Sequence, residues 1–160
     1  MKVFRIEREK YLKTTLSGIG ASTSEGFRWN SFNTRIVYTA ETRALATLEV
    51  AVHLDLSEDL PTDRFYVEID IPDNIQILEV DLEVLPEGWD SKPPILVTQL
   101  IGDAFANRNE AAVLKVPSAV VPYEFNYLIN PNHADFKHVK VLKTVKMQFD
   151  SRLTKTNNFR

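Results

Sequence analysis

The most informative absence in this 160-residue sequence is cysteine. Without cysteine the chain has no disulfide bond, no thiolate-bound zinc and no cysteine nucleophile. An excess of positive charge is also absent, because the formal net charge is −3 at pH 7. We therefore expect no direct contact with nucleic acid, whose binding proteins carry a basic surface.

Long apolar runs are missing as well. No segment approaches the roughly 20 apolar residues that a membrane-spanning helix requires. The opening segment MKVFRIEREKYLK alternates charged and apolar residues, so it lacks the continuous apolar stretch of a secretory signal. We expect a cytoplasmic protein that makes no contact with a membrane. Its length suits one domain that buries roughly two-thirds of its unfolded surface.

Alternation of apolar and polar residues predicts strands in most of the chain. Residues 65–71 alternate strictly, and Pro72 ends this half-buried strand. The segment 113–121 is β-branched and interrupted by proline, which indicates a strand and loop at an edge or at a site. Lysines recur along 137–149, as on a solvated edge strand, with Val139, Val141, Val145, Met147 and Phe149 facing one way. Further strands are expected over residues 2–6, 35–40 and 75–80.

Two helices are predicted, one from about Thr39 or Glu41 to Leu54 and one from Thr98 to about Asn107. The glycine- and serine-rich residues 17–25 and the segment 85–94 are expected to be loops. Strands that outnumber helices, joined by short connections, predict an α+β fold. We expect a single compact domain over residues 1–153 and a frayed tail over 154–160. The apolar positions of the two helices are Leu45, Leu48, Ala51 and Val52, then Leu100, Ile101, Ala104 and Phe105.

Glu49 is the first candidate for chemistry. At about 100° per residue it lies close to Leu45 and Val52 around the first predicted helix, on the shoulder of the apolar stripe. One interpretation is a rim carboxylate paired with a cation such as Arg35 or Arg43. The other is a carboxylate directed into a cleft, where it stabilises a developing positive charge.

Arg28 and Arg5 are the candidate anion ligands. Arg28 follows a glycine-containing loop and precedes Trp29 and Asn30, a run of stacking and hydrogen-bonding groups. Its guanidinium suits a diphosphate, because it donates two parallel hydrogen bonds. A surface stacking pair with Trp29 is the alternative. Arg5 alternates with Phe4 and Ile6 in a predicted strand, so it either points into the same cleft or is an exposed strand charge.

A third cluster is VPSAVVPYEFNYLINPNH, residues 116–133, whose prolines and asparagines indicate a rigid loop system. Ser118 either binds a ligand hydroxyl or caps its own turn. It is not a hydrolase nucleophile, because no G-x-S-x-G motif surrounds it. The three histidines lack metal-site spacing, so no metal is expected, and SGIGAS lacks the third glycine of a dinucleotide fingerprint.

The order of these motifs resembles the RES-domain family, which is named after an arginine, a glutamate and a serine. The resemblance covers nearly the whole chain, and the block at 116–133 is its most specific part. It places Arg28, Glu49 and Ser118 at the three naming positions, and Arg5 and Tyr38 at two further pocket positions. The quoted motifs are Phe4-Arg5-Ile6, GIGA, GFRWN, IVYTA, ALATLEV, the 116–133 block and FDSRL.

Members of that family are toxins of bacterial toxin–antitoxin pairs. The resemblance implies a fold similar to ADP-ribosyltransferases, NAD⁺ as substrate with no other cofactor, and an antitoxin with an Xre-like helix-turn-helix domain. It implies cleavage of the nicotinamide–ribose bond by water or phosphate, which causes growth arrest. A protein ADP-ribosyltransferase and a non-catalytic partner-binding relative are the alternatives.

The same resemblance assigns roles to the five residues. Glu49 stabilises the sugar cation, Arg28 and Arg5 hold the diphosphate, and Tyr38 contacts the nicotinamide. Ser118 orients the ribose or Glu49. Three positions depart from the family pattern. Phe27 replaces a glycine and could narrow the pocket, Asn33 replaces a glycine, and Phe105 replaces a tryptophan.

Overall fold

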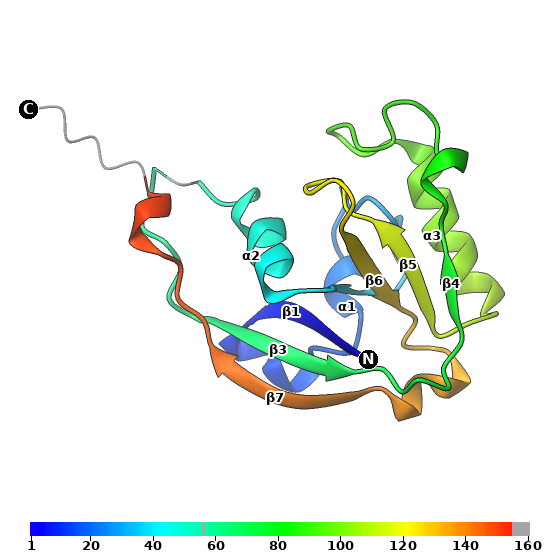
Figure 1. Cartoon of the computed structure of the whole chain (residues 1–160), viewed down its shortest axis with the longest axis horizontal. Coiled ribbons are helices and arrows are strands. Elements are labelled where there is room, and N and C mark those ends of the chain that lie inside the picture. Colours follow the sequence, from blue (N-terminus) through cyan, green and yellow to red (C-terminus); the bar gives the residue numbers. More distant parts are fainter. Residues whose placement is uncertain (56, 155–160) are drawn as a thin grey trace, which may run out of the picture.

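The computed structural model describes residues 1–55 and 57–154 and contains a single mixed sheet of seven strands (Figure 1). Across the sheet the order is β4-β5-β6-β2-β1-β3-β7, and every neighbouring pair is antiparallel except the parallel β4–β5 pair. The strands are β1 Lys2–Arg8, β2 Val37–Ala40, β3 Arg64–Asp70, β4 Ile77–Glu79, β5 Val113–Pro117, β6 Phe125–Ile129 and β7 Lys140–Lys146. The α-helices are α1 Ile19–Ser22, α2 Arg43–Ala51 and α3 Leu96–Arg108. The predicted α+β class is confirmed.

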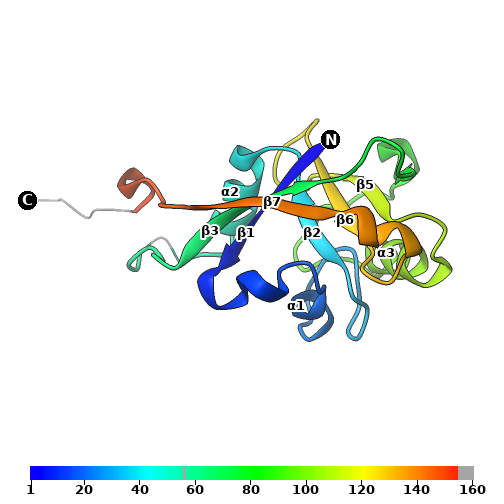
Figure 2. The same ribbon diagram turned by 90° about the horizontal axis from the view of Figure 1, so that it is seen from below.

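Helices cover both faces of the sheet. Helix α2 lies on one side of β1, while α1 and the 3₁₀ helix η1 (Glu9–Thr14) lie on the other (Figure 2). Beneath α2, its buried Leu45 packs with Phe4 and Ile6 of β1. Helix α3 packs on β5 and β6 through Phe105, which shares a cluster with Trp29. The phenylalanine at 105 therefore fills the packing position expected for the replaced tryptophan.

Strands β1 and β2 pair at one register position only, Phe4 opposite Ala40. By contrast, β1 pairs with β3 along its full length, from Lys2 opposite Asp70 to Arg8 opposite Arg64. Beyond Phe4, therefore, β1 follows β3 and leaves the ladder with β2.

The first helix is shorter than predicted. It begins after Thr42, whose hydroxyl accepts a hydrogen bond from the Leu45 backbone N–H and so caps the helix. The expected burial of Leu48 and Val52 is wrong, since these side chains are 44% and 41% exposed. The helix carries only a narrow buried stripe, and Val52 lines a cavity described below.

The last strand also differs from expectation. Val141 pairs with Ile69 and Val145 pairs with Tyr66, with a register irregularity between Glu68 and Ile69. Ile69 and Tyr66 are three residues apart in a strand, so the two valines lie on opposite faces. All of β7 is exposed, as predicted for a lysine-rich edge.

The structure also bears on the predictions for the segment 113–121, the loop at 17–25, Leu100, Asn33 and the tail. Strand β5 lies inside the sheet instead of at an edge, and its end at Pro117 leads into the site. The loop predicted for 17–25 contains the short helix α1. Leu100 is 55% exposed, against the expected burial. Asn33 has a φ of 70°, which asparagine tolerates where the family has glycine. Most of the predicted tail, 155–160, lies outside the described residues.

No helix among the described residues is both long and apolar enough to cross a membrane.

Candidate active site

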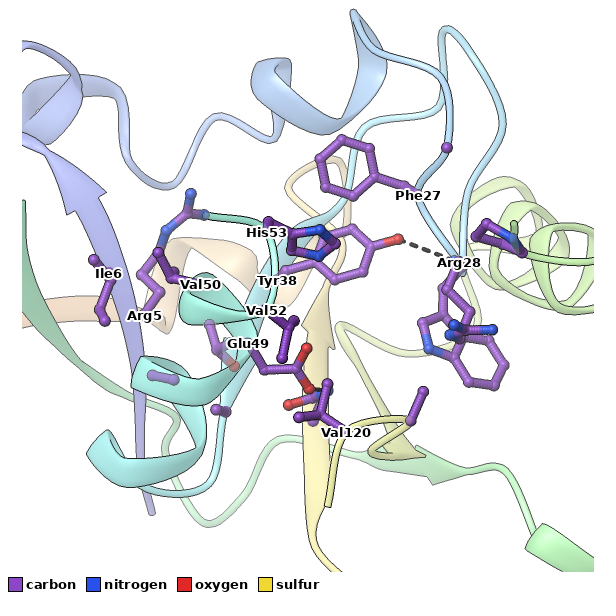
Figure 3. Close-up of a pocket in the computed structure, with 18 of the residues that line it drawn as sticks. Arg5, Ile6, Phe27, Arg28, Tyr38, Glu49, Val50, Val52, His53 and Val120 are labelled. Carbon is purple, nitrogen blue, oxygen red and sulfur yellow. Dashed lines mark hydrogen bonds between the residues drawn. The ribbon is translucent and has the colours of Figure 1, made fainter. Parts of the chain in front are cut away.

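A cavity of about 720 Å³ opens between α2 and the parted strands β1 and β2. This volume is within the ~300–1,000 Å³ that is usual for small-molecule sites. Glu49, Arg28, Tyr38 and Arg5 all line it (Figure 3). Ser118 lies directly behind Glu49 and touches its carboxylate. The sequence-derived candidates therefore meet at one place.

Glu49 is held through one of its two carboxylate oxygens. Ser118 Oγ donates a hydrogen bond to Glu49 Oε1 over 3.1 Å, and Asn126 Nδ2 donates to the same oxygen over 2.7 Å. Within residues 1–55 and 57–154, Oε2 accepts no hydrogen bond. The carboxylate thus has a fixed orientation, and one oxygen remains available to a ligand in the cavity.

Asn126 is the site residue whose contact with Glu49 the sequence does not reveal. It lies in β6 opposite Ala40 and lines the cavity. From sequence it looked like one of several asparagines that rigidify a loop system. Its Oδ1 is buried and has no hydrogen-bond partner in the described part of the chain. Asn126 therefore orients the carboxylate and holds an unused acceptor beside it.

Ser118 caps its own turn, one of the two alternatives considered for it, and also contacts Glu49. Its hydroxyl oxygen accepts hydrogen bonds from the backbone N–H groups of Val120 and Val121, each over 3.1 Å. The same hydroxyl donates to Glu49, and the side chain is buried. Ser118 therefore shapes the turn that forms the cavity wall at Val120 and positions the glutamate.

Arg28 faces the cavity, but its terminal nitrogens are engaged by the protein itself. Nη1 donates to the carbonyl oxygens of Trp89 over 2.6 Å and Ser91 over 3.1 Å. Nη2 donates to the carbonyl oxygens of Asp90 over 3.2 Å and Ser91 over 3.1 Å. The guanidinium also lies 5.9 Å from the centre of the Trp89 ring. Arg28 therefore fastens residues 89–91, which lead into the cavity rim at Lys92 and Pro93.

The loop that carries Arg28 is fixed against α3. A Cβ atom at Gly102 would overlap the carbonyl oxygen of Trp29, so only glycine permits this close approach. Gln99 Nε2 donates to the Phe27 carbonyl oxygen over 3.0 Å, and Asp103 accepts from the Ser31 backbone N–H over 3.0 Å.

Burial lowers the pKa of Arg28, while the charges of Asp90 and Glu49 oppose this change.

Tyr38 presents its ring to the cavity, while its hydroxyl is hydrogen-bonded within the protein. The hydroxyl donates to Asn30 Oδ1 over 2.7 Å and accepts from the Trp29 backbone N–H over 3.1 Å. Burial raises the pKa of Tyr38 well above its ordinary value, so the phenol stays neutral. The Phe27 ring lies 5.1 Å from the Tyr38 ring at a tilt of 38°. Phe27 thus joins Tyr38 in an aromatic wall of the cavity.

Arg5 supplies a cation with unused donors. Its Nη2 donates to Glu7 Oε2 over 2.9 Å, whereas its Nε is buried without a partner among the described residues. Burial lowers the pKa of Arg5, and the neighbouring Glu7 charge opposes this effect. The alternative of an exposed strand charge is excluded, because the side chain is only 22% exposed.

The described residues contain no cluster of three or more histidine, aspartate or glutamate side chains that could hold a metal ion. His53 lines the cavity, and His133 caps a 3₁₀ helix far along the sequence. The residues that meet in the cavity offer an oriented carboxylate, half-buried cations and aromatic rings.

These features define an α+β domain with a ligand-sized cavity centred on a positioned glutamate. The model of the RES domain family matches residues 2–150, and the chain belongs to this family. The family and the fold class predicted from the sequence are both confirmed.

Relatives support the family assignment, and a solved structure supports the fold. The chain is 42% identical over 146 residues, 89% of each sequence, to the Prs ADP-ribosylating toxin of Sphingobium sp.. It is 39% identical over 156 residues to Toxin Res of Photorhabdus laumondii, covering 97% of this chain and 98% of the relative. The structure of the M. tuberculosis MbcT–MbcA toxin–antitoxin complex has a similar fold, with a TM-score of 0.74 and 15% identity. That match covers 92% of this chain and 84% of the other.

Proposed function

We propose that this chain, as the toxin of a toxin–antitoxin system, cleaves the nicotinamide–ribose bond of NAD⁺. The observation that carries the proposal is the orientation of Glu49, held through Oε1 by Ser118 and Asn126 in a cavity of about 720 Å³. The names of the relatives support the toxin assignment, and one of them is named for ADP-ribosylation.

Glu49 would act on the charge that develops during bond cleavage. When the bond between the anomeric carbon and the nicotinamide nitrogen breaks, its electrons go to nicotinamide and the sugar gains oxocarbenium character. A carboxylate placed beside the ribose stabilises that cation, because a cavity with little water strengthens the interaction. Nicotinamide leaves as a neutral molecule, so the site needs no strong general acid. A nucleophile then adds to the anomeric carbon and releases its proton.

The other residues would bind and orient the substrate. Arg5 has unused N–H donors for the diphosphate, and the ring of Tyr38, backed by Phe27, can pack against nicotinamide. Arg28 holds residues 89–91 with its terminal nitrogens, so in this arrangement only its Nε–H is left for a phosphate oxygen. Ser118 acts through Glu49 instead of touching the sugar.

Two acceptors deserve a direct comparison, namely a small molecule and a protein. Water would release free ADP-ribose, and phosphate would release its phosphorylated form. The Sphingobium relative, 42% identical, is named for ADP-ribosylation of Prs, so Prs is the first protein acceptor to test. The remaining alternative is that this chain binds partners without catalysing a reaction, in which case NAD⁺ would stay intact.

One experiment separates these outcomes. Purified protein is incubated with NAD⁺ labelled in the adenosine half, with phosphate varied and with Prs present or absent. Free nicotinamide together with ADP-ribose supports hydrolysis, phosphate-dependent product supports phosphorolysis, and label on Prs supports transfer. Intact NAD⁺ in every reaction, with a folded protein, would contradict the proposal. Glu49→Gln serves as the inactive control.

The partner of this toxin would be an antitoxin, as in the toxin–antitoxin complex that shares its fold. We expect the antitoxin to carry an Xre-like helix-turn-helix domain and the pair to act in the cytoplasm. Co-expression of the neighbouring small reading frame should restore growth and recover both proteins in one complex. Growth arrest that this reading frame does not relieve would contradict the pairing.

A further inference from the structure

Glu68 is a buried carboxylate in β3, with an exposed fraction of 4%. Its Oε1 lies 2.8 Å from Lys2 Nζ, and its Oε2 lies 2.8 Å from Arg43 Nη2 and 3.6 Å from Lys143 Nζ. The hydrogen bond from Lys2 lowers the pKa of this carboxyl, and the charges of the other two cations act in the same direction, against the effect of burial. The three cations belong to β1, α2 and β7, so one ionised carboxylate connects β3 to three other elements.

Arg43 is the first residue of α2, and its contacts fasten one flank of this helix to β3. Besides its hydrogen bond to Glu68, its guanidinium lies 5.0 Å from the centre of the Phe4 ring and 6.0 Å from the centre of the Tyr66 ring. One helical turn later, Thr47 Oγ1 forms a hydrogen bond of 2.8 Å with the Tyr66 hydroxyl. Arg43 and Thr47 are four residues apart, so both lie on the same flank of α2.

Glu49 lies on a different side of the same helix. Thr47 and Glu49 are two residues apart, which corresponds to about 200° around a helix. The apolar contact of α2 with the sheet is small, because its buried residues are Leu45, Ala46 and Ala51. Alanine side chains make few contacts that would resist a rotation of the helix. The polar contacts on its flanks therefore help to decide how α2 is turned, and with it the direction of the Glu49 side chain.

We propose that Glu68 is a positioning residue that acts through Arg43 and α2 on Glu49. It keeps α2 turned so that the Glu49 carboxylate meets the side chains of Ser118 and Asn126, which donate hydrogen bonds to it. Neither Glu68 nor Arg43 lines the Glu49 cavity in the described part of the chain, so neither touches a ligand bound there. The effect on catalysis rests on the proposed function, whereas the effect on the position of Glu49 does not.

Arg43→Met and Lys143→Met form a matched pair of variants. Each removes one cation from Glu68 and leaves the carboxylate two others. Arg43→Met keeps an apolar stem against Phe4 and Tyr66 but releases α2 from the carboxylate. Lys143→Met changes the contact with β7 only. Glu68→Gln removes the charge that all three cations share.

We expect Arg43→Met and Glu68→Gln each to lower kcat for NAD⁺ by about fivefold with KM within about twofold, because a misplacement of ~1 Å can cost about 10²-fold and a smaller one is expected here. Lys143→Met should keep the wild-type kcat, even where it lowers the melting temperature as much as Arg43→Met does. Arg43→Lys should restore part of the lost kcat. Equal kcat values for Arg43→Met and Lys143→Met would overturn the inference, and so would a wild-type kcat in Glu68→Gln.

A spectroscopic measurement separates this inference from the proposed function. In isotope-labelled protein, the side-chain amide protons of Asn126 report the hydrogen bond to Glu49 Oε1 without any substrate, and Asn126→Ala assigns their NMR signal. Arg43→Met and Glu68→Gln should shift this signal, and Lys143→Met should leave it in place. This pattern in a protein that does not cleave NAD⁺ would remove the proposed activity and keep the positioning. Cleavage of NAD⁺ by a wild type whose signal stays fixed in every variant would do the reverse.

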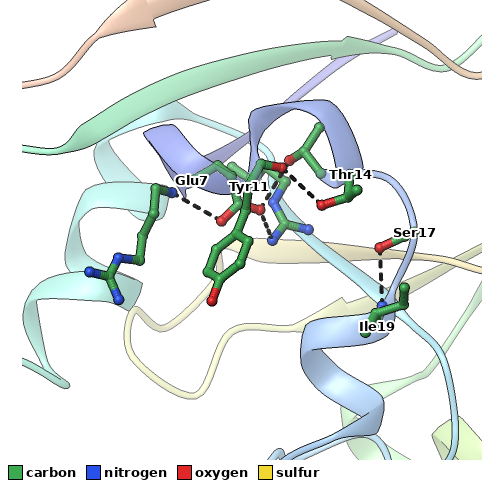
Figure 4. A network of polar contacts seen from close by, with 8 residues as sticks. Glu7, Tyr11, Thr14, Ser17 and Ile19 are labelled. Atoms are coloured by element: carbon green, nitrogen blue, oxygen red, sulfur yellow. Dashed lines mark hydrogen bonds and ion pairs between the residues drawn. The ribbon is translucent and has the colours of Figure 1, made fainter.

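Glu7 provides a control for the loss of a buried charge in general. This glutamate of β1 is 11% exposed, and its Oε2 accepts hydrogen bonds from Arg5 Nη2 over 2.9 Å and from Thr15 Oγ1 over 3.2 Å (Figure 4). Within the described residues it forms no hydrogen bond or ion pair with α2. Glu7→Gln should therefore leave the Asn126 signal in place. A shift as large as that in Glu68→Gln would overturn the inference, because any change of charge in the sheet would then reach Asn126.

Discussion

Glu49 and Arg28 line the same cavity and carry opposite charges, but their side chains are hydrogen-bonded in different ways. Glu49 is fixed through one oxygen, by Ser118 and Asn126, and keeps the other oxygen free. Arg28 uses both terminal nitrogens to hold three backbone carbonyl groups of residues 89–91. The first residue is presented to a ligand, whereas the second holds the segment that leads into the cavity rim at Lys92 and Pro93.

This difference teaches that membership in a motif does not define a residue's function. The resemblance places both residues at naming positions of the family, and both line the same cavity. A carboxylate with one free oxygen can act on a substrate directly. A guanidinium that is already hydrogen-bonded acts mainly by positioning the segment it holds. The variants below are chosen to test this contrast.

The largest expected effect follows from Glu49→Gln. The glutamine carbonyl oxygen can still accept from Ser118 and Asn126, so the fold should remain, but the negative charge beside the ribose is lost. We expect kcat for NAD⁺ cleavage to fall by about 10²–10³-fold, the usual cost of removing one electrostatic contact to a transition state. Product analysis by chromatography measures the rate. Glu87→Gln, at an exposed position, is the matched control. Retention of more than a tenth of the wild-type rate would remove Glu49 from the chemistry.

Asn126→Ala should have the next largest effect. It removes the 2.7 Å hydrogen bond to Glu49 Oε1 and leaves Ser118 as the remaining support. Hydrogen bonds to charged groups are worth about 1.5–3 kcal/mol, so a fall in kcat of roughly tenfold is expected with little change in KM. Steady-state kinetics separates the two constants, and Asn107→Ala at an exposed position of α3 is the control. If KM rises while kcat stays constant, Asn126 binds the substrate instead of orienting Glu49.

Arg28→Lys tests the other half of the comparison. Lysine keeps the charge but cannot hold three carbonyl groups with a planar fork. We expect faster proteolytic cleavage within residues 86–95, a loss of about 1–3 kcal/mol in unfolding free energy and a fall of severalfold in turnover. Limited proteolysis with mass spectrometry measures the first effect, and Arg35→Lys at an exposed position is the control. An unchanged cleavage pattern combined with a large rise in the KM for NAD⁺ would instead make Arg28 a direct ligand.

Much of the fold could be predicted from the sequence, because it depends on local patterns. The alternation over 65–71 correctly predicts β3, and the placement of Glu49 on the shoulder of a helix correctly predicts a half-buried carboxylate. The edge position of the lysine-rich strand follows from the same reasoning. These features depend on the regular spacing at which side chains point to one face of a helix or strand. That spacing can be read from residues that are close together in the sequence.

What the sequence could not predict depends on contacts between distant segments. Asn126 meets Glu49 across 77 residues, and Arg28 meets the carbonyl groups of 89–91 across more than 60. Every residue has a backbone carbonyl group, so the sequence does not show which of them bind the Arg28 side chain.

Glu68 is a further residue whose environment the sequence did not predict. The alternation places it on the polar face of β3, yet it is buried. Lys2 and Arg43, each 2.8 Å away, and Lys143 at 3.6 Å surround its carboxylate.

The smallest effect on activity is expected for Tyr38→Phe, because the ring that faces the cavity is kept. The variant leaves Asn30 Oδ1 and the Trp29 backbone N–H without their hydroxyl partner, and both residues are buried. Unsatisfied buried groups of this kind cost about 1–3 kcal/mol each, so urea unfolding should show a clear loss of stability, while turnover stays within about twofold.

A pH series sharpens this last prediction. The folded state raises the pKa of Tyr38, so the unfolded chain loses its phenolic proton first as the pH rises above about 10. Unfolding is therefore favoured in that range, and stability is lost there and not at lower pH. Tyr38→Phe removes this contribution, so the stability difference between wild type and variant should shrink above pH about 10. A constant difference across that range would mean that the hydroxyl is not buried as described. A turnover loss as large as that of Asn126→Ala would mean that the hydroxyl, and not only the ring, contacts the substrate.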